Sequence, residues 1–154
     1  STCVGEGPFV CEWFGPEAEK LREAGFEYGA KTGRPRRVGP IDVVATRYGV
    51  QTQGATTIAL TKLDVLSYMD RIPVCTKYVA DGKETDKFPF PAALAEAKPV
   101  IEYLEGWGCD ISGVRTWEDL PKQAQAYVEY LEQAIGCHIG YVSVGPERDA
   151  YIKR

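Results

Sequence analysis

The spacing of apolar and polar residues predicts helices and strands in mixed order along the chain. The clearest helix is expected at 118–136, where Gly136 supplies a stop. Its apolar face is formed by Ala124, Tyr127, Leu131 and Ile135. A shorter helix, PEAEKLREAG, is predicted to begin at Pro16 and to end at Gly25, because acidic residues occupy its first turn and a glycine closes it.

A third helix is predicted after Pro40, in the stretch IDVVATRYGVQTQ, and it should end near Gly54. Its apolar stripe would consist of Ile41, Val44 and Tyr48, which recur at helical spacing. Residues 1–15 are rich in glycine and aromatic residues, so they are expected to form a loop.

Four segments have the composition of β-strands. The run TTIALT (56–61) lacks polar alternation, as a strand buried on both faces would. Residues 72–90 form two extended runs around Asp81-Gly82, which predicts a hairpin. Further strands are expected at 99–107 and 137–145. We therefore expect one mixed α/β domain over 1–154, a three-layer type of sheet with flanking helices and a β-hairpin.

Composition narrows the classes of function. The net charge of −4 argues against a general nucleic-acid binder, which relies on contacts to phosphate. The longest apolar runs are too short to span a membrane, and STCVGEGPF has no signal-peptide pattern. The five cysteines are scattered without a C-x-x-C pair, so neither a zinc site nor a disulfide framework is indicated. Reduced thiols in a cytoplasmic protein are the simplest interpretation.

The segment GAKTGRPRR is the most highly charged loop in the chain. Between 28 and 40, five glycines or prolines alternate with four cations, which excludes a regular element. Arg34, Arg36 and Arg37 can bind carboxylate or phosphate with their forked guanidinium groups. Three interpretations remain open: an anion-binding loop for a small ligand, a DNA minor-groove arm resembling an AT-hook core, and a solvated basic loop.

The stretch LTKLDVLSY places charged residues at the end of a predicted strand. A strand that ends at Thr61, Lys62 and Asp64 places a cation and a carboxylate at its carboxyl end, where ligands of α/β folds commonly bind. The lysine stem can lie along a flat base while the carboxylate accepts two N–H donors from its edge. Guanine offers that donor pair, N1–H and N2–H, and adenine does not. The alternative is an ordinary strand end with two solvated charges.

Two further features of the sequence involve residues that can bind a ligand or transfer a proton. VSVGPER ends a strand with Ser143, Gly145 and Pro146, which can present backbone groups to a ligand or form a simple turn. His138, the only histidine, is expected to be a packing or surface residue. The chain contains no G-x-x-x-x-G-K-[ST] phosphate loop, and one histidine does not suffice for a credible Ser/His/Asp set.

In this order, VGEGPF, GAKTGRPRR, LTKLDVL and VSVGPER resemble the carboxyl-terminal third of the adenylosuccinate synthetase family. The resemblance covers essentially all 154 residues and implies part of a larger P-loop-related GTP-binding fold. It also implies a ligase of purine nucleotide (AMP) biosynthesis that joins IMP and L-aspartate using GTP. In this reaction the IMP 6-oxygen is phosphorylated, and the aspartate amine then displaces phosphate.

The resemblance assigns roles to residues in three segments. The aspartate loop would consist of Ala30, Lys31, Thr32, Gly33, Arg34, Pro35 and Arg36. Thr32 would donate a hydrogen bond to the aspartate carboxylate, while Arg34 would clamp that carboxylate and also reach the ribose of IMP. GTP would be contacted by Arg36, Lys62, Leu63, Asp64, Ser143, Val144 and Gly145.

The sequence departs from the family pattern at two places. Lys31 stands where the family usually has the first threonine of A-T-T-G-R, which puts one hydroxyl contact to aspartate in doubt. Gly39-Pro40-Ile41-Asp42 replaces the usual G-W-[LF]-D, a change that starts a helix and touches no chemistry.

The family's phosphate loop, catalytic aspartate, catalytic histidine and Mg²⁺ site belong to its amino-terminal part. We therefore expect no catalytic residue and no metal ligand here, and no turnover by this fragment alone. The resemblance implies a homodimer for the complete enzyme, with GTP or GDP, IMP and L-aspartate as ligands and neither nucleic acid nor membrane as a partner. The alternative is a stand-alone guanine-nucleotide-binding regulatory module.

Overall fold

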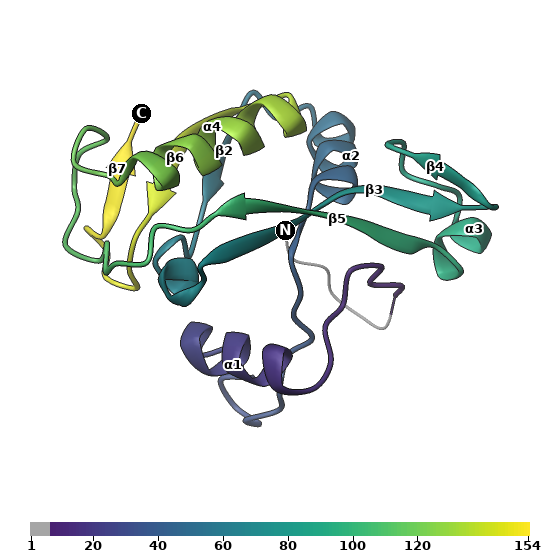
Figure 1. The fold of residues 1–154 in the computed structure, drawn as a ribbon, viewed down its shortest axis with the longest axis horizontal. Helices are drawn as coiled ribbons and strands as arrows, with labels where there is room; N and C mark the ends of the chain where they lie inside the picture. The colour runs from purple at the N-terminus through teal and green to yellow at the C-terminus, as the bar shows by residue number, and fades with distance from the viewer. Residues whose placement is uncertain (1–6) are drawn as a thin grey trace. The chain divides into compact units, whose positions relative to one another are not determined.

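The computed structural model describes residues 7–154 and has the mixed α/β architecture that the sequence predicts (Figure 1). The chain divides into two compact units. One takes the residues up to Ala45 together with Pro73–Glu102, and the other takes Thr46–Ile72 and Tyr103–Arg154. The sequence pattern predicts one domain without a boundary, because each crossing between the units lies inside a regular element rather than in a glycine- or proline-rich linker.

The first unit is built around strand pairing with β3. Its elements are α1 (Pro16–Gly25), β1 (Ile41–Asp42), β3 (Arg71–Ala80), β4 (Lys83–Thr85), α3 (Pro91–Ala95) and β5 (Lys98–Glu105), of which β3 and β5 extend into the second unit. Strand β1 pairs with β3 in parallel, β4 pairs with β3 antiparallel, and β5 also pairs with β3. The predicted helix at Pro16 and the predicted strand near 99–107 are therefore confirmed.

The β3–β4 hairpin turns at the predicted dipeptide. Asp81 and Gly82 both have positive φ, at 51° and 73°. This backbone twist matches the right-handed twist of the two strands, which is why Asp-Gly is favoured in two-residue hairpin loops. The hairpin is confirmed.

A small apolar core fills the first unit. Its buried members are Cys11, Val44, Cys75 and Tyr78. The partly buried residues packed against them are Phe9, Val10, Phe88, Leu94, Ala97 and Ile101. Contact with Cys75, burial and the neighbouring Asp42 raise the pKa of Cys11, while burial and the hydrogen bond to Asp42 raise the pKa of Tyr78. Both groups are therefore neutral at physiological pH.

The second unit combines a three-stranded sheet with helices. Its elements are most of α2 (Val43–Gln53), β2 (Thr57–Leu60), the 3₁₀ helix η1 (Asp64–Tyr68), α4 (Lys122–Ile135), β6 (His138–Ser143) and β7 (Tyr151–Lys153). Strand β6 is central: it pairs in parallel with β2 and antiparallel with β7. The helix at 118–136 and the strand at 137–145 are thus confirmed with slightly shorter bounds.

Helix α4 buries the face that its periodicity predicts. All four residues of the predicted face are buried, together with Val128. Gly136 follows the helix in the left-handed conformation, φ 74°, and its N–H donates to the carbonyl of Glu132. The Tyr127 ring packs edge-on against Trp107 with centroids 5.9 Å apart. Burial of this face against the sheet stabilises the unit.

Two sequence-based expectations were wrong in detail. The strand at 56–61 was expected to be buried on both faces, but in β2 Thr57 and Ala59 are exposed and the intervening residues only half-buried. Within 7–154, β2 pairs with β6 alone, so it is an edge strand here.

The helix after Pro40 begins later than predicted. Ile41 pairs with β3 as part of β1 instead of starting the helix, and Tyr48 is 50% exposed. Val44 of the predicted stripe is buried, and the other buried residue of α2 is Val43, which the stripe did not include. The shift has a local cause, since Asp42 accepts the N–H of Ala45 through Oδ1 at 2.9 Å and caps the helix there.

No helix in the described part of the chain combines the length and the apolar character that crossing a membrane requires.

Gly106 provides a test of the packing in the second unit. A Cβ at this position would collide with the carbonyl oxygen of Met69, next to Asp70, whose carbonyl accepts the Gly106 N–H at 2.8 Å. We expect Gly106→Ala to lower the free energy of unfolding by roughly 2–3 kcal/mol, as overpacking against backbone does. The control Gly113→Ala meets open space and should change it by less than about 0.5 kcal/mol. Urea denaturation measures both, and equal stability of the two variants would contradict the packing described here.

Candidate functional site

The predicted aspartate loop is folded back on itself by backbone hydrogen bonds. The N–H of Gly29 donates to the carbonyl of Arg34 at 2.8 Å, and the N–H of Gly33 donates to the carbonyl of Gly29 at 2.8 Å. The N–H of Arg36 donates to the carbonyl of Glu27 at 2.9 Å. These bonds give a tight projecting turn instead of an extended strap.

Two glycines permit this turn. Gly33 has φ 63°, in the left-handed region where a Cβ is costly. At Gly29 a Cβ would lie 2.9 Å from the hydroxyl of Thr32. That hydroxyl in turn accepts the N–H of Arg34 at 3.4 Å. The glycines of GAKTGRPRR are thus required by the shape of the loop.

The three arginines of the loop have different environments. The side chains at 30–37 are all exposed. Among the described residues the Arg34 guanidinium has no hydrogen-bond or ion-pair partner. Arg36 forms a 2.8 Å ion pair with Glu27. Arg34 is therefore ready for an anion, whereas Arg36 must exchange a carboxylate partner to bind one.

Arg37 anchors the loop. Its guanidinium contacts Glu12 through two nitrogens, at 2.8 and 2.6 Å, and donates to the carbonyl of Gly7 at 2.8 Å. The same group lies over the Phe9 ring, 5.5 Å from its centroid. The sequence grouped Arg37 with the other arginines, but these contacts give it a positioning role. The VGEGPF motif that supplies Gly7 and Phe9 begins outside the described residues.

Parallel pairing in the second unit brings the predicted guanine residues together. Leu60 of β2 is in register with Val142 of β6, so the segments that follow the two strands emerge at the same edge. The N–H of Leu63 donates to the carbonyl of Ser143 at 3.1 Å, and the Leu63 side chain is buried. The two motifs are thus neighbours in space, although about 80 residues separate them in the chain.

Lys62 lies in an unusual backbone conformation. Its φ is 62°, the left-handed region, while its side chain is exposed. For a residue other than glycine this conformation costs about 1 kcal/mol. Such strain is common where a side chain must be held at a functional position.

Asp64 carries the most informative feature of this half of the site. It begins η1, and its Oδ1 is buried without a hydrogen-bond partner among the described residues. Burial raises the pKa of Asp64, although nearby backbone N–H groups and Lys62 oppose that rise. Buried acceptors are nearly always satisfied. An unsatisfied carboxylate oxygen therefore indicates a place for a ligand N–H donor.

The turn at 143–145 lies next to the segment that contains Asp64 and is held by hydrogen bonds of its own. The Ser143 hydroxyl donates to the carbonyl of Gly145 at 3.0 Å, and the N–H of Val144 donates to the carbonyl of Ala150 at 2.9 Å. At Gly145 a Cβ would lie 3.0 Å from both Ala150 and Glu147. A larger residue at Gly145 would disturb this turn.

The predicted residues therefore fall into two groups. The aspartate loop belongs to the first compact unit and the guanine motif to the second. The role of Arg36 on the GTP side stays a prediction.

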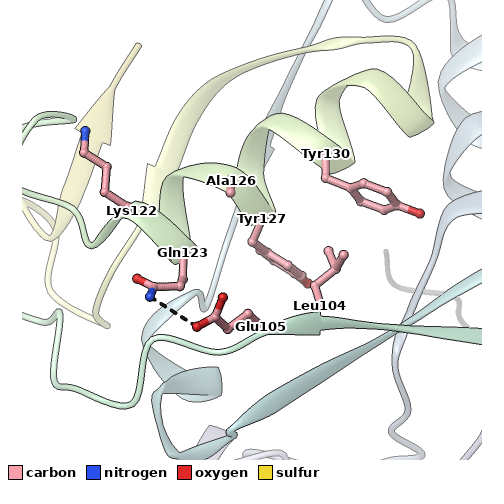
Figure 2. Close-up of a pocket in the computed structure, with 7 residues that line it drawn as sticks. All are labelled: Leu104, Glu105, Lys122, Gln123, Ala126, Tyr127 and Tyr130. Carbon is pink, nitrogen blue, oxygen red and sulfur yellow. Dashed lines mark hydrogen bonds between the residues drawn. The ribbon is translucent and has the colours of Figure 1, made fainter.

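A separate groove in the second unit contains none of the residues predicted to bind aspartate, IMP or GTP. Its volume is about 440 Å³, and Figure 2 shows Tyr127 of α4 projecting toward Leu104 of β5 inside it. Its lining consists of Leu104, Glu105, Lys122, Gln123, Ala126, Tyr127 and Tyr130. Gln123 contacts Glu105 at 3.4 Å across the groove.

His138 has the surface role that the sequence suggested. Its ring is exposed, and Nδ1 lies 3.0 Å from Oε2 of Glu132. The same oxygen accepts the N–H of Ile139 at 2.7 Å and pairs with Arg154 at 2.8 Å. Burial alone would raise the pKa of Glu132, but the Ile139 N–H and the positive charge of Arg154 lower it. His138 thus contributes to the contacts that Glu132 of α4 makes with the start of β6.

The raised pKa of Asp64 predicts a stability difference that depends on pH. Because the folded state disfavours the ionised carboxyl, ionisation lowers stability at neutral pH, and this penalty vanishes as the pH falls below the unfolded-state pKa. We expect Asp64→Asn, which removes the charge with little change in volume, to melt at a higher temperature than the parent at pH 7. Melting curves recorded from pH 7 to pH 3 should show the gap closing. A gap that is independent of pH would contradict this reading of Asp64.

Comparison with known proteins agrees with the geometry. Residues 1–152 match the family model described as adenylosuccinate synthetase. The chain is 51% identical to the adenylosuccinate synthetases of Pelobacter propionicus and Geobacter sulfurreducens, over 152 residues, 98% of this chain but only 35% of each relative. The structure of fully ligated adenylosuccinate synthetase from Plasmodium falciparum superposes with a TM-score of 0.91 at 35% identity, covering 98% of this chain and 37% of that one. The chain belongs to the adenylosuccinate synthetase family.

Proposed function

We propose that this chain is the carboxyl-terminal region of an adenylosuccinate synthetase, a cytoplasmic and homodimeric enzyme that joins IMP and L-aspartate using GTP. In this proposal the chain supplies guanine recognition and the aspartate loop. The observation that carries it is the buried, unpartnered Oδ1 of Asp64 within the motif Thr61-Lys62-Leu63-Asp64. Family membership and the span of 35% of the relatives support a part of the enzyme rather than the whole.

Guanine recognition follows from the donors on its ring edge. N1–H and N2–H point in the same direction and match the two oxygens of one carboxylate, so a base seated at Asp64 satisfies the orphan oxygen. Adenine presents an acceptor at N1, so it cannot offer this pair of donors to the two oxygens. The stem of Lys62 lies along the base, and the turn 143–145 borders it.

Aspartate recognition follows from the state of the loop. A dicarboxylate needs forked cations, and Arg34 carries an exposed guanidinium without a partner within 7–154. Binding to Arg34 would replace water with two parallel charge-assisted bonds and would place the amine for attack on phosphorylated IMP. Thr32 donates a further hydrogen bond, and Arg34 also reaches the ribose of IMP. Lys31 offers an ammonium where the family usually has a hydroxyl.

The magnesium ion that such chemistry uses is assigned to residues outside this chain. Among residues 7–154 the cluster of acidic and sulfur ligands that converges is Cys11, Asp42 and Cys75, and it is buried. Mg²⁺ prefers oxygen ligands and retains several waters, so this cluster does not suit it. The groups that phosphorylate IMP and transfer protons are likewise placed outside this chain. Accordingly, this chain binds and orients substrates.

The guanine assignment is tested by Asp64→Asn in the full-length enzyme. The amide keeps one acceptor for N1–H but places its own N–H₂ group against the N2–H₂ group of guanine. Two donors then face each other, and the preference for guanine is lost. We expect kcat/KM for GTP to fall about 10- to 100-fold, the effect of one buried unsatisfied donor pair. Xanthine has an acceptor at C2, so XTP should become the better substrate. Steady-state rates with both nucleotides measure this, and an unchanged GTP rate would exclude Asp64 as the base reader.

The aspartate loop is tested by Arg34→Leu in the same enzyme. Loss of a forked contact to a charged substrate should raise the KM for aspartate about 10- to 100-fold and also lower kcat. Arg115→Leu is the matched control, because the Arg115 guanidinium donates to the backbone carbonyls of Ser112 and Val114. An aspartate KM that is unchanged in Arg34→Leu would remove this residue from the loop's function. The regulatory-module alternative instead predicts that this chain prefers GDP over ADP without any synthetase partner.

A further inference from the structure

Three side chains with metal-binding atoms meet inside the first unit. Cys11 comes from the segment before α1, Asp42 from β1 and Cys75 from β3. Their ligand atoms lie within 4.8 Å of one another. The three residues are 2%, 8% and 0% exposed, respectively. The cluster belongs to neither half of the proposed substrate site.

The carboxyl group of this cluster is buried, and no cation among the described residues pairs with it. Within the described residues, Asp42 forms no ion pair, and each of its hydrogen-bond donors is neutral. Its Oδ1 accepts the N–H of Ala45 at 2.9 Å, while Oδ2 accepts the hydroxyl of Tyr78 and the thiol of Cys11. A buried carboxylate is costly unless it is paired or coordinates a metal. This environment therefore favours a cation near Oδ2.

The spacing of the atoms suits a small tetrahedral ion. Cys11 Sγ lies 3.8 Å from Asp42 Oδ2. Zinc–sulfur and zinc–oxygen bonds in a tetrahedral site place the two ligand atoms about 3.5 Å apart, so only a small contraction is required. The carbonyl of Pro40, 3.4 Å from Cys11 Sγ, is a further oxygen at the cluster.

The ligand types and their supports indicate which ion would bind. Two thiolates with one carboxylate select Zn²⁺ and similar ions over Mg²⁺ or Ca²⁺. Ligating carboxylates in metal sites are themselves held by hydrogen bonds. Asp42 is held in this way by the N–H of Ala45 and the hydroxyl of Tyr78.

We propose that Cys11, Asp42 and Cys75 form a structural site for a thiolate-binding divalent cation, of which Zn²⁺ is the best match. Binding would release the protons of both thiols to solvent, so that two thiolates and one carboxylate hold the ion. The ion would join three segments that are distant in the sequence. One of these segments includes Glu12, the partner of Arg37, so the site would also stiffen the base of the aspartate loop.

The site is tested in the full-length protein by Co²⁺ titration, because cobalt bound to thiolate gives a sulfur-to-metal charge-transfer absorption. We expect one equivalent to produce that band in the parent and in Cys109→Ser, the control at an exposed cysteine. In Cys11→Ser and Cys75→Ser the apparent affinity should fall at least about 10-fold, the loss that follows removal of a ligand or its support. Absence of the band from the parent, or an equal band in Cys75→Ser, would overturn the proposal.

A second measurement needs no variant, in case the substitutions prevent folding. The parent protein is treated with iodoacetamide in mild denaturant with and without Zn²⁺, and the alkylated peptides are mapped by mass spectrometry. Zn²⁺ should slow alkylation of Cys11 and Cys75 at least several-fold while Cys109 reacts equally in both samples. Equal labelling of Cys11 and Cys75 in the two samples would refute a metal site. So would a disulfide between them that forms in air whether or not Zn²⁺ is present.

Discussion

The parallel pairing of β2 with β6 is the constraint on which the candidate guanine site depends. It is short, four residues on the β2 side, yet it determines that the segments after both strands leave the sheet at one edge. The hydrogen bond from Leu63 to Ser143 then fixes the distance between those segments. If the register slipped by one residue, Leu63 would turn away from the core and Asp64 would no longer begin η1 beside β6.

In the arginine-rich loop, three arginines that look alike in the sequence have different partners in the structure. Arg37 is held by Glu12, Gly7 and Phe9, so it contributes position instead of binding capacity. The exposed guanidinium of Arg36 pairs with the half-buried carboxylate of Glu27, a pairing of small net stability that a ligand can replace. Within 7–154 the Arg34 guanidinium has no such partner, so the loop combines an anchored base with an available guanidinium.

The elements with strong local signals were predictable from sequence. Proline and glycine bounded α1, Asp-Gly set the β3–β4 hairpin, and apolar periodicity defined α4. The partial exposure of β2 was not predictable, because an apolar run does not show how many strands pair with it or what covers its faces. The onset of α2 depended on pairing with β3, and β7 is only three residues long, too short to give a pattern. The structure places the segments around Leu63 and Ser143 side by side, while their ligand contacts stay predictions. The anchor role of Arg37 and the meeting of Cys11, Asp42 and Cys75 depend on tertiary contacts, which the sequence does not reveal.

The left-handed backbone of Lys62 has a consequence for attempts to stabilise this protein. A chain optimised for folding alone would place glycine at this position, since glycine adopts φ 62° without steric strain. The lysine at this position is consistent with the proposed contact of its side chain with the guanine base. Scores that reward relaxed backbones would rank Lys62→Gly as an improvement and would thereby remove the cation beside Asp64. If Lys62 has the proposed role, a gain in stability from this substitution would come with a loss of nucleotide binding, and stability alone would be a misleading guide for protein engineering.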